Sequence, residues 1–297
     1  MKEMEKMEMD EFAAEVCAAV KERLGSDYNV DVREVRKNNG VVLHGLTARY
    51  QQQNVAPTVY LEPFLELYGY GTAFGTVVRK VEDALREELK KEPVDMGFFR
   101  SFDAVRDRIC YRLIGRAGNE KLLEEIPHTG FLDMEVCFYY AYQGEALGNG
   151  TILIYNSHME AWGTCTEELM GLARENTPRL FPWSCRSLQE VLEEIALGGE
   201  SFQDIPMKVL GNDRGTHGAA CILYPGVLEE IAGEMGDFFI LPSSIHEVVL
   251  LPDTCGVDRE SLKKMVREVN VTQVAPEDVL SDTLYRYDRA GRRVVMA

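Results

Sequence analysis

The apolar residues of this chain recur with two different periods, and this mixture restricts its fold more than any other feature. Some runs repeat every three to four residues, as in residues 10–24 and 72–91, which predicts amphipathic helices. Other runs alternate or are continuously apolar, as in residues 105–114 and 132–142, which predicts strands. We therefore expect an α+β fold in which amphipathic helices pack on mixed sheets.

Turn and cap signals mark where these elements begin and end. Asn38-Asn39-Gly40 separates two alternating runs and predicts a β-hairpin, because Asn and Gly tolerate positive φ. Thr164 with Glu167, and Ser187 with Glu190, have the spacing of a capping box and predict two helix starts. The first of these helices should end before Pro178, since residues 177–186 hold two prolines and are typical of a connector.

This connector suggests two lobes. A chain of 297 residues is long enough for about two domains. We expect an N-terminal lobe over residues 1–180, a connector with a short helix over 181–205, and a C-terminal lobe over 206–297. The predicted order in the C-terminal lobe is ββαββαβ, with residues 219–223 as its second strand.

The charge balance argues against two classes of partner. The chain has 49 acidic and 32 basic residues, a net charge of -17, and such a field repels phosphate backbones and anionic lipid. We therefore expect no general nucleic-acid binding. We also expect no membrane association, because even a long uncharged stretch such as residues 146–159 is too short to span a bilayer. Two arginine-rich segments, residues 100–116 and 286–293, should form internal ion pairs; anion binding is the alternative.

The location of the protein follows from its first residues and its cysteines. Charges are interleaved through residues 1–12, which is unlike a secretory signal. The seven cysteines are odd in number and form no CxxC pair, which is typical of reduced thiols. These features predict a cytoplasmic protein.

The strongest candidate for chemistry is Ser244, His246 and Glu247, which precede an apolar strand. In an extended chain the Cα atoms of Ser244 and His246 lie about 6.6 Å apart and Glu247 faces the other side, so they cannot form a local triad. Catalysis would need Cys221 or Ser244 as nucleophile and His217 or His246 as base, brought together by the fold. The structural alternative is a turn whose serines bond the backbone, beside an apolar, inert Cys221.

Signals for bound groups are absent from the sequence. The five histidines show no pair at the spacing of a zinc site, and residues 69–75 lack the Gly-Lys-Ser/Thr pattern of a phosphate-binding loop. We therefore expect neither a metal nor a cofactor.

Several segments have a distinctive amino-acid sequence. They include residues 56–61 (APTVYL), 126–140 (IPHTGFLDMEVCFYY), 218–232 (GAACILYPGVLEEIA) and 240–253 (ILPSSIHEVVLLPD). Together these segments resemble an uncharacterised bacterial family catalogued as a domain of unknown function, over roughly residues 10–288. The resemblance implies an association with mobile genetic elements and no particular activity, cofactor or catalytic residue.

The sequence therefore leads to two hypotheses for the function of the protein. The favoured one is a non-catalytic intracellular binding or regulatory protein whose partner is another protein, as an accessory of a mobile genetic element. The alternative is a hydrolase or transferase with a Ser or Cys nucleophile and a His base assembled across the fold.

Overall fold

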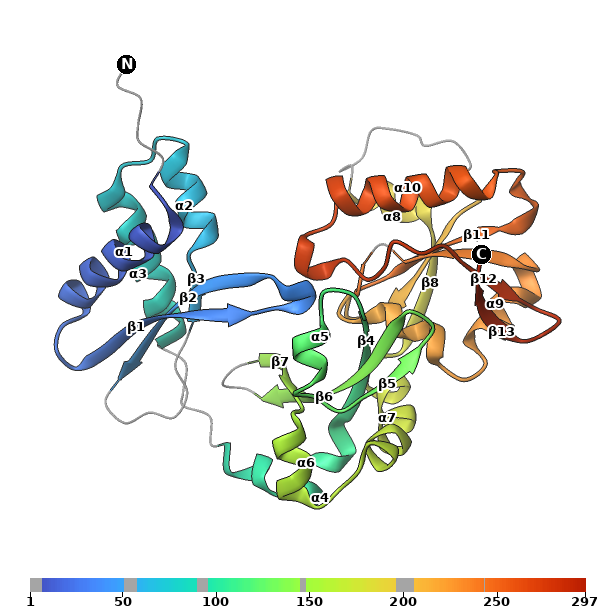
Figure 1. Ribbon diagram of the computed structural model, residues 1–297, viewed down its shortest axis with the longest axis horizontal. Coiled ribbons are helices and arrows are strands. Elements are labelled where there is room, and N and C mark those ends of the chain that lie inside the picture. The colour runs from blue at the N-terminus through green and yellow to red at the C-terminus, as the bar shows by residue number, and fades with distance from the viewer. Residues whose placement is uncertain (1–6, 51–57, 90–95, 145–147, 196–205, 243) are drawn as a thin grey trace. The chain divides into compact units, whose positions relative to one another are not determined.

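The computed structural model describes residues 7–50, 58–89, 96–144, 148–195, 206–242 and 244–297 (Figure 1). The chain divides into two compact units. Unit 1 consists of residues 1–37, 41–96 and 143–149, and unit 2 of residues 38–40, 97–142 and 150–297.

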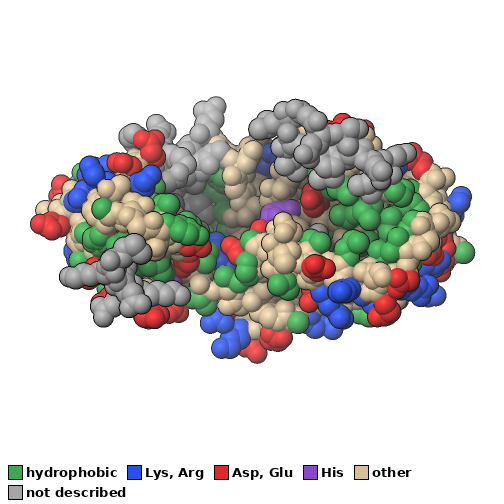
Figure 2. Space-filling model, turned by 90° about the horizontal axis from the view of Figure 1, so that it is seen from above, with side chains coloured by type: hydrophobic (Ala, Val, Ile, Leu, Met, Phe, Trp, Pro, Cys, Tyr) green, Lys and Arg blue, Asp and Glu red, His purple; other side chains and the backbone are tan. Residues whose placement is uncertain are grey.

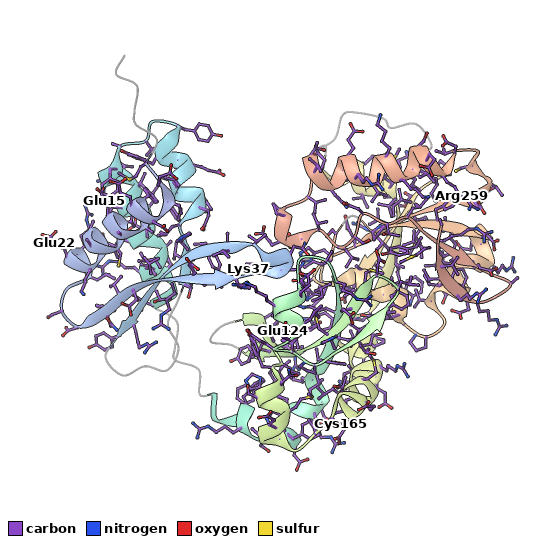
Figure 3. The ribbon with its side chains drawn as sticks, in the orientation of Figure 1. Glu15, Glu22, Lys37, Glu124, Cys165 and Arg259 are labelled. Atoms are coloured by element: carbon purple, nitrogen blue, oxygen red, sulfur yellow. The ribbon has the colours of Figure 1, made fainter. Side chains whose placement is uncertain are left out.

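Unit 1 is a small three-stranded antiparallel sheet with helices packed on it (Figure 1). Its strands, in the order β1-β2-β3, are β1 (Tyr28–Arg36), β2 (Val42–Tyr50) and β3 (Thr58–Tyr60), and its helices are α1 (Met9–Leu24), α2 (Glu62–Gly69) and α3 (Phe74–Leu89). The apolar stripes of α1 and α3 meet the sheet in one core, which includes Phe12, Val16, Leu46, Val77 and Val81. Glu15 and Glu22 project from the opposite, exposed face of α1 (Figure 3).

The predicted hairpin and the first helix are confirmed. β1 and β2 pair in register from Tyr28 opposite Tyr50 to Arg36 opposite Val42, and Asn39 takes a positive φ of 59° in the turn. α1 ends at Leu24 and is capped by Gly25, whose backbone N–H donates to the carbonyl of Lys21. The short helix α2 was not predicted.

Unit 2 contains two sheets. In the first, β6 (Met134–Gly144) lies between β4 (Ile109–Gly115) and β5 (His128–Phe131) and also pairs with β7 (Gly148–Leu153). The second has six strands in the order β13-β12-β10-β11-β9-β8. They are β8 (Trp183–Ser187), β9 (Lys208–Asn212), β10 (Phe238–Leu241), β11 (Val248–Pro252), β12 (Tyr285–Asp288) and β13 (Arg293–Met296).

Helices cover both sheets of unit 2 (Figure 1). The α-helices are α4 (Phe102–Val105), α5 (Glu120–Leu123), α6 (Asn156–Trp162), α7 (Thr166–Leu180), α8 (Leu188–Ile195), α9 (Val227–Met235) and α10 (Arg259–Thr272). Short 3-10 helices are η1 (Asn38–Gly40), η2 (Met96–Arg100), η3 (Arg106–Arg108), η4 (Gly218–Leu223), η5 (Asp253–Cys255) and η6 (Pro276–Asp278).

The strand β10 of the six-stranded sheet is buried on both faces, because its alternate residues enter different cores. Phe238 and Ile240 lie in the main core, which also contains residues of β4, β6, α7 and α9. Phe239 and Leu241 face the other way and pack with Leu262 of α10. This explains why β10 is continuously apolar in sequence rather than alternating.

The α+β class is confirmed, although the sheets differ from the mixed ones we expected. The described strand pairs of defined register are all antiparallel. The capping box at Ser187 is also confirmed, since the backbone N–H of Glu190 donates to Ser187 Oγ over 3.1 Å and that of Ser187 donates to Glu190 Oε2 over 3.1 Å.

The prediction that a helix ends before Pro178 is wrong. α7 begins at Thr166 and continues to Leu180 with Pro178 inside it. Contacts with β4 hold this last turn in place: Thr177 Oγ1 accepts the backbone N–H of Tyr111 over 3.1 Å, and Asn176 Nδ2 donates to the carbonyl of Ile109 over 3.0 Å. Tertiary hydrogen bonds therefore outweigh the local preference of proline.

Two further expectations differ from the structure. Residues 183–187 of the expected connector form β8, which pairs along its length with β9, so the units divide near residue 96 rather than within 181–205. Residues 219–223 lie in the 3-10 helix η4 instead of a strand. A short run that is apolar at every position does not distinguish a strand from a buried helix, and residues 218–222 are all buried.

Internal ion pairing of the two arginine-rich segments is confirmed for several members. Arg286 donates to the carboxylates of Asp237 and Asp253, and Arg116 Nε lies 2.6 Å from Glu135 Oε1. In the described part of the chain, no helix combines the length and apolar character needed to cross a bilayer.

Candidate functional site

Two of the predicted site residues, His217 and His246, meet in unit 2. Their rings stack with centroids 5.9 Å apart and planes 16° from parallel. His217 follows β9 and has a left-handed backbone, with φ 54° and ψ 26°, whereas His246 precedes β11. The residue after His217 must be glycine, because a Cβ on Gly218 would lie 2.5 Å from the carbonyl oxygen of His246.

Asn212 shapes the loop that carries His217. Its Oδ1 accepts the backbone N–H of Arg214 over 3.0 Å, and its Nδ2 donates to the carbonyl of Thr216 over 2.8 Å. Asparagine side chains commonly close turns in this way, by replacing backbone partners. The loop is therefore held by its own hydrogen bonds.

Both ring nitrogens of His246 are engaged. Nδ1 accepts the backbone N–H of His217 over 3.3 Å, so in the neutral ring the proton resides on Nε2, which lies 3.3 Å from Oδ1 of Asp278. A general base needs a nitrogen lone pair directed at the proton it removes. In this arrangement the lone pair already accepts a backbone hydrogen bond.

His217 is buried and uncharged. It is 8% exposed, its Nε2 lies 3.3 Å from Arg112 Nη1, and its ring is 5.1 Å from that of Tyr139. Burial, together with the charges of Arg112 and His246, lowers the pKa of His217 to about 3. Because Arg112 donates to Nε2, the proton resides on Nδ1, which has no partner among the described residues.

The two predicted nucleophiles, Ser244 and Cys221, each form a hydrogen bond with the backbone. Ser244 Oγ accepts the backbone N–H of His246 over 2.8 Å, which is the turn contact of the structural alternative. Cys221 Sγ donates to the carbonyl of Gly211 over 3.1 Å, and burial raises the pKa of Cys221 to about 12, so it is a thiol at neutral pH. Glu247 is exposed.

The fold thus unites His217 and His246 and adds Arg112 and Asp278, which the sequence did not indicate. Asp278 lies 32 residues from His246, and Arg112 lies 105 residues from His217, so no local pattern links them. Within the described ranges, no three His, Cys, Asp or Glu side chains come together as metal ligands. The arrangement resembles a polar network that fixes turns more than a reacting site.

A second candidate is a pocket of about 870 Å³ in unit 1. It lies between the start of α1, the strand β2 and the helix α2. Its apolar lining residues are Met7, Met9, Val42, Leu65, Tyr68 and Tyr70, and its polar ones are His44, Glu62 and Glu66. An apolar pocket with a few convergent polar groups is the usual form of a binding site.

His44 joins the three elements that form this pocket. Its Nδ1 lies 3.0 Å from Glu62 Oε1 at the start of α2, and its Nε2 lies 3.1 Å from Asp10 Oδ1 at the start of α1. Burial alone would lower the pKa of His44, but the hydrogen bonds to Glu62 and Asp10 outweigh it and raise the pKa. When the ring is protonated it donates to both carboxylates, which fixes the pocket wall.

The pocket is acidic and has an apolar rim. No Lys or Arg occurs among the described residues that line it, and Oε2 of Glu62 is buried without a hydrogen-bond partner among them. Tyr70 at the end of α2 is 86% exposed, and Val42, which also lines the pocket, is exposed as well. Sequence reasoning missed this site because α2 has only eight residues; Glu62 and Pro63 in its first turn were the available signal.

These observations define an α+β protein of two units with an acidic, apolar-rimmed pocket on the first unit. The chain belongs to DUF5688, a family of unknown function, whose family model matches residues 9–289. Neither a curated protein nor a solved structure matches the chain.

Proposed function

We propose that the protein is a non-catalytic binding protein whose unit 1 pocket holds an apolar side chain from a basic segment of another protein. The observation that supports this most is the exposure of Tyr70 at the rim of an acidic pocket. Tyrosine is enriched at the energetic centres of protein interfaces, because it offers a large apolar area and one polar group. An aromatic side chain that is 86% exposed has no role in the core of its own unit.

Charge complementarity supports a basic partner. Glu62 and Glu66 line the pocket, and His44 beside them is hydrogen-bonded to Glu62 and to Asp10. Lysine or arginine next to the apolar anchor would meet this field. An amphipathic helix with its apolar face in the pocket is one recurring way of binding such a groove.

Acidic mimicry of a nucleic acid receives less support. Figure 2 shows Lys and Arg side chains interspersed with Asp and Glu over the face in view, whereas mimicry of a phosphate backbone requires an extended surface of one sign. A local acidic pocket suits a short basic segment better.

The hydrolase or transferase alternative also receives less support. Ser244 bonds the backbone of His246 rather than its ring, and Cys221 is a buried thiol. The association with mobile genetic elements stays a prediction that rests on the family resemblance.

The test measures binding of a fluorescein-labelled amphipathic helical peptide of leucine and lysine by fluorescence polarisation. We expect saturable binding, and about tenfold weaker binding by Tyr70→Ser, the loss typical of an aromatic anchor. The matched control is Val257→Ser, which changes an apolar side chain of 40% exposure in unit 2. A second peptide carries glutamate in place of each lysine.

Two results would contradict the proposal. Equal affinity for the lysine and glutamate peptides would remove the role of charge. Equal weakening by Tyr70→Ser and Val257→Ser would show that the peptide does not use the unit 1 pocket.

A further inference from the structure

A second pocket, in unit 2, differs in chemistry from the first. It has a volume of about 580 Å³ and lies between the end of α10, the segment that connects α10 to β12, and the turns after β4 and β5. A volume of this size is typical of small-molecule sites. Its polar and charged residues are Asn39, Arg116, Asp133, Asn270, Ser281, Asp282 and Thr283, and its apolar ones include Val271, Val274, Pro276 and Val279.

One wall of this pocket is held rigidly by asparagines. Asn39 Nδ2 donates to the carbonyls of Pro276 and Val279 over 2.8 and 2.7 Å. Asn119 Nδ2 lies 3.0 Å from Asn39 Oδ1, and Asn38 Nδ2 donates to the carbonyl of Glu277 over 2.8 Å. The segment that carries the apolar residues is therefore fixed before any ligand arrives, which reduces the entropy lost on binding.

Asp133 provides a fixed negative charge. Its carboxylate accepts hydrogen bonds from Tyr285 Oη, from Thr283 Oγ1 over 2.7 Å and from Ser281 Oγ over 3.1 Å. Burial would raise the pKa of Asp133, but these hydrogen bonds outweigh it and lower the pKa. The group is ionised at neutral pH, and no Lys or Arg is among its hydrogen-bond partners in the described residues.

Asn270 carries an acceptor that the protein itself does not satisfy. This side chain is 5% exposed, and its Nδ2 donates to the carbonyl of Ser281 over 3.0 Å and to Asp282 Oδ1 over 2.7 Å. The amide orientation follows from these partners, because both are acceptors. Oδ1 is then buried without a partner among the described residues, which is unfavourable unless a donor is supplied.

The positive charge nearest this pocket is already compensated. Arg116 lines the pocket, but its Nε lies 2.6 Å from Glu135 Oε1 and its Nη2 donates to the carbonyl of Leu132. Asp133 and the exposed Asp282 therefore leave the pocket acidic. Val271, which is 85% exposed, extends the apolar side to the rim.

We infer that this unit 2 pocket binds a small amphiphilic amine, with the ammonium group directed at Asp282, Asp133 and the unpartnered Oδ1 of Asn270. The hydrocarbon part lies along Val271, Val274 and Val279. An ammonium group suits this set, because it brings three donors and no acceptor. This assignment is independent of the protein-binding pocket on unit 1.

The test follows hexylamine binding by ¹H–¹⁵N NMR of the full chain. We expect saturable shifts of the backbone amides of Ser281 and Thr283 and of the side-chain amide of Asn270. Hexanol has the same chain without a charge and hexanoate has the opposite charge, so both should bind at least tenfold more weakly. Equal binding of hexanol, or the absence of saturable shifts at these residues, would overturn the assignment.

Two further experiments test whether the Asp282 carboxylate binds the ammonium group, and whether the ligand is a free amine or a lysine side chain. Asp282→Asn keeps the acceptor that Asn270 uses and removes the charge, so it should weaken hexylamine binding roughly threefold to tenfold. Glu268→Gln, an exposed change on α10 outside the pocket, is the matched control and should have no effect. An unchanged affinity for Asp282→Asn would overturn the site. Tighter binding of a blocked lysine, N-acetyl-lysine N-methylamide, would overturn the choice of a free amine in favour of a lysine side chain.

Discussion

The buried imidazole of His217 should make unit 2 less stable in mild acid. Its pKa is about 3 in the folded protein and about 6.5 in an unfolded chain. Between these values the unfolded state binds a proton that the folded state does not, so the free energy of unfolding falls as the pH falls. The contribution of His217 is fully present above about pH 6.5 and declines by about 1.4 kcal/mol per pH unit below it.

Between pH 7 and pH 5 this amounts to about 2 kcal/mol of the free energy of unfolding. Urea unfolding of the protein and of His217→Asn at both pH values measures it. Asparagine tolerates the left-handed backbone at this position but does not titrate. The variant is expected to lose less stability than the natural chain between pH 7 and pH 5, by about 2 kcal/mol.

Titrations shared by the two proteins cancel in this comparison. The same pH dependence in both proteins would refute the assignment of a neutral, buried His217. A larger loss of stability in His217→Asn would refute it as well, because the sign would be reversed.

Three further predictions concern other groups. His44 has a raised pKa, so its contribution to the stability of unit 1 should be present below pH 6.5 and be lost as the pH rises through the folded pKa; His44→Gln should flatten this dependence in urea unfolding. Gly218→Ala places a Cβ against the backbone and should lower the free energy of unfolding by about 3 kcal/mol, measured by thermal or urea unfolding. Gly233→Ala has open space around it within α9 and should raise the free energy of unfolding by up to about 1 kcal/mol. Equal effects of the two substitutions would contradict the close packing at residue 218. In iodoacetamide labelling of the folded protein at pH 8, read by mass spectrometry, the exposed Cys165 (Figure 3) should react well before Cys221, and the reverse order would contradict a buried thiol of raised pKa.

Sequence patterns predicted the elements whose signals are local. Asn39 and Gly40 tolerate the positive φ that a tight turn needs, and Ser187 and Glu190 satisfy each other's backbone N–H groups within one turn. The continuation of α7 through Pro178 was not predictable in the same way. The side chains that hold its last turn form hydrogen bonds with β4, more than sixty residues earlier in the chain.

The candidate sites depend even more on distant contacts. His217 and His246 were candidates because histidine is a common general base. The hydrogen bonds of their rings depend on Arg112 and Asp278, which no spacing rule connects to them. The unit 1 pocket depends on a histidine of β2 placed between the starts of two helices. Only the fold shows that this histidine has two carboxylate partners.

Amide hydrogen exchange with the leucine and lysine peptide tests the proposed function most directly. At a saturating peptide concentration, exchange should slow in residues 62–70 and 42–44, which contribute to the unit 1 pocket. Exchange in residues 212–218 and 244–247, around the histidine pair, should not change. Protection concentrated at the histidine pair, or spread evenly over the described residues, would contradict a binding site on unit 1.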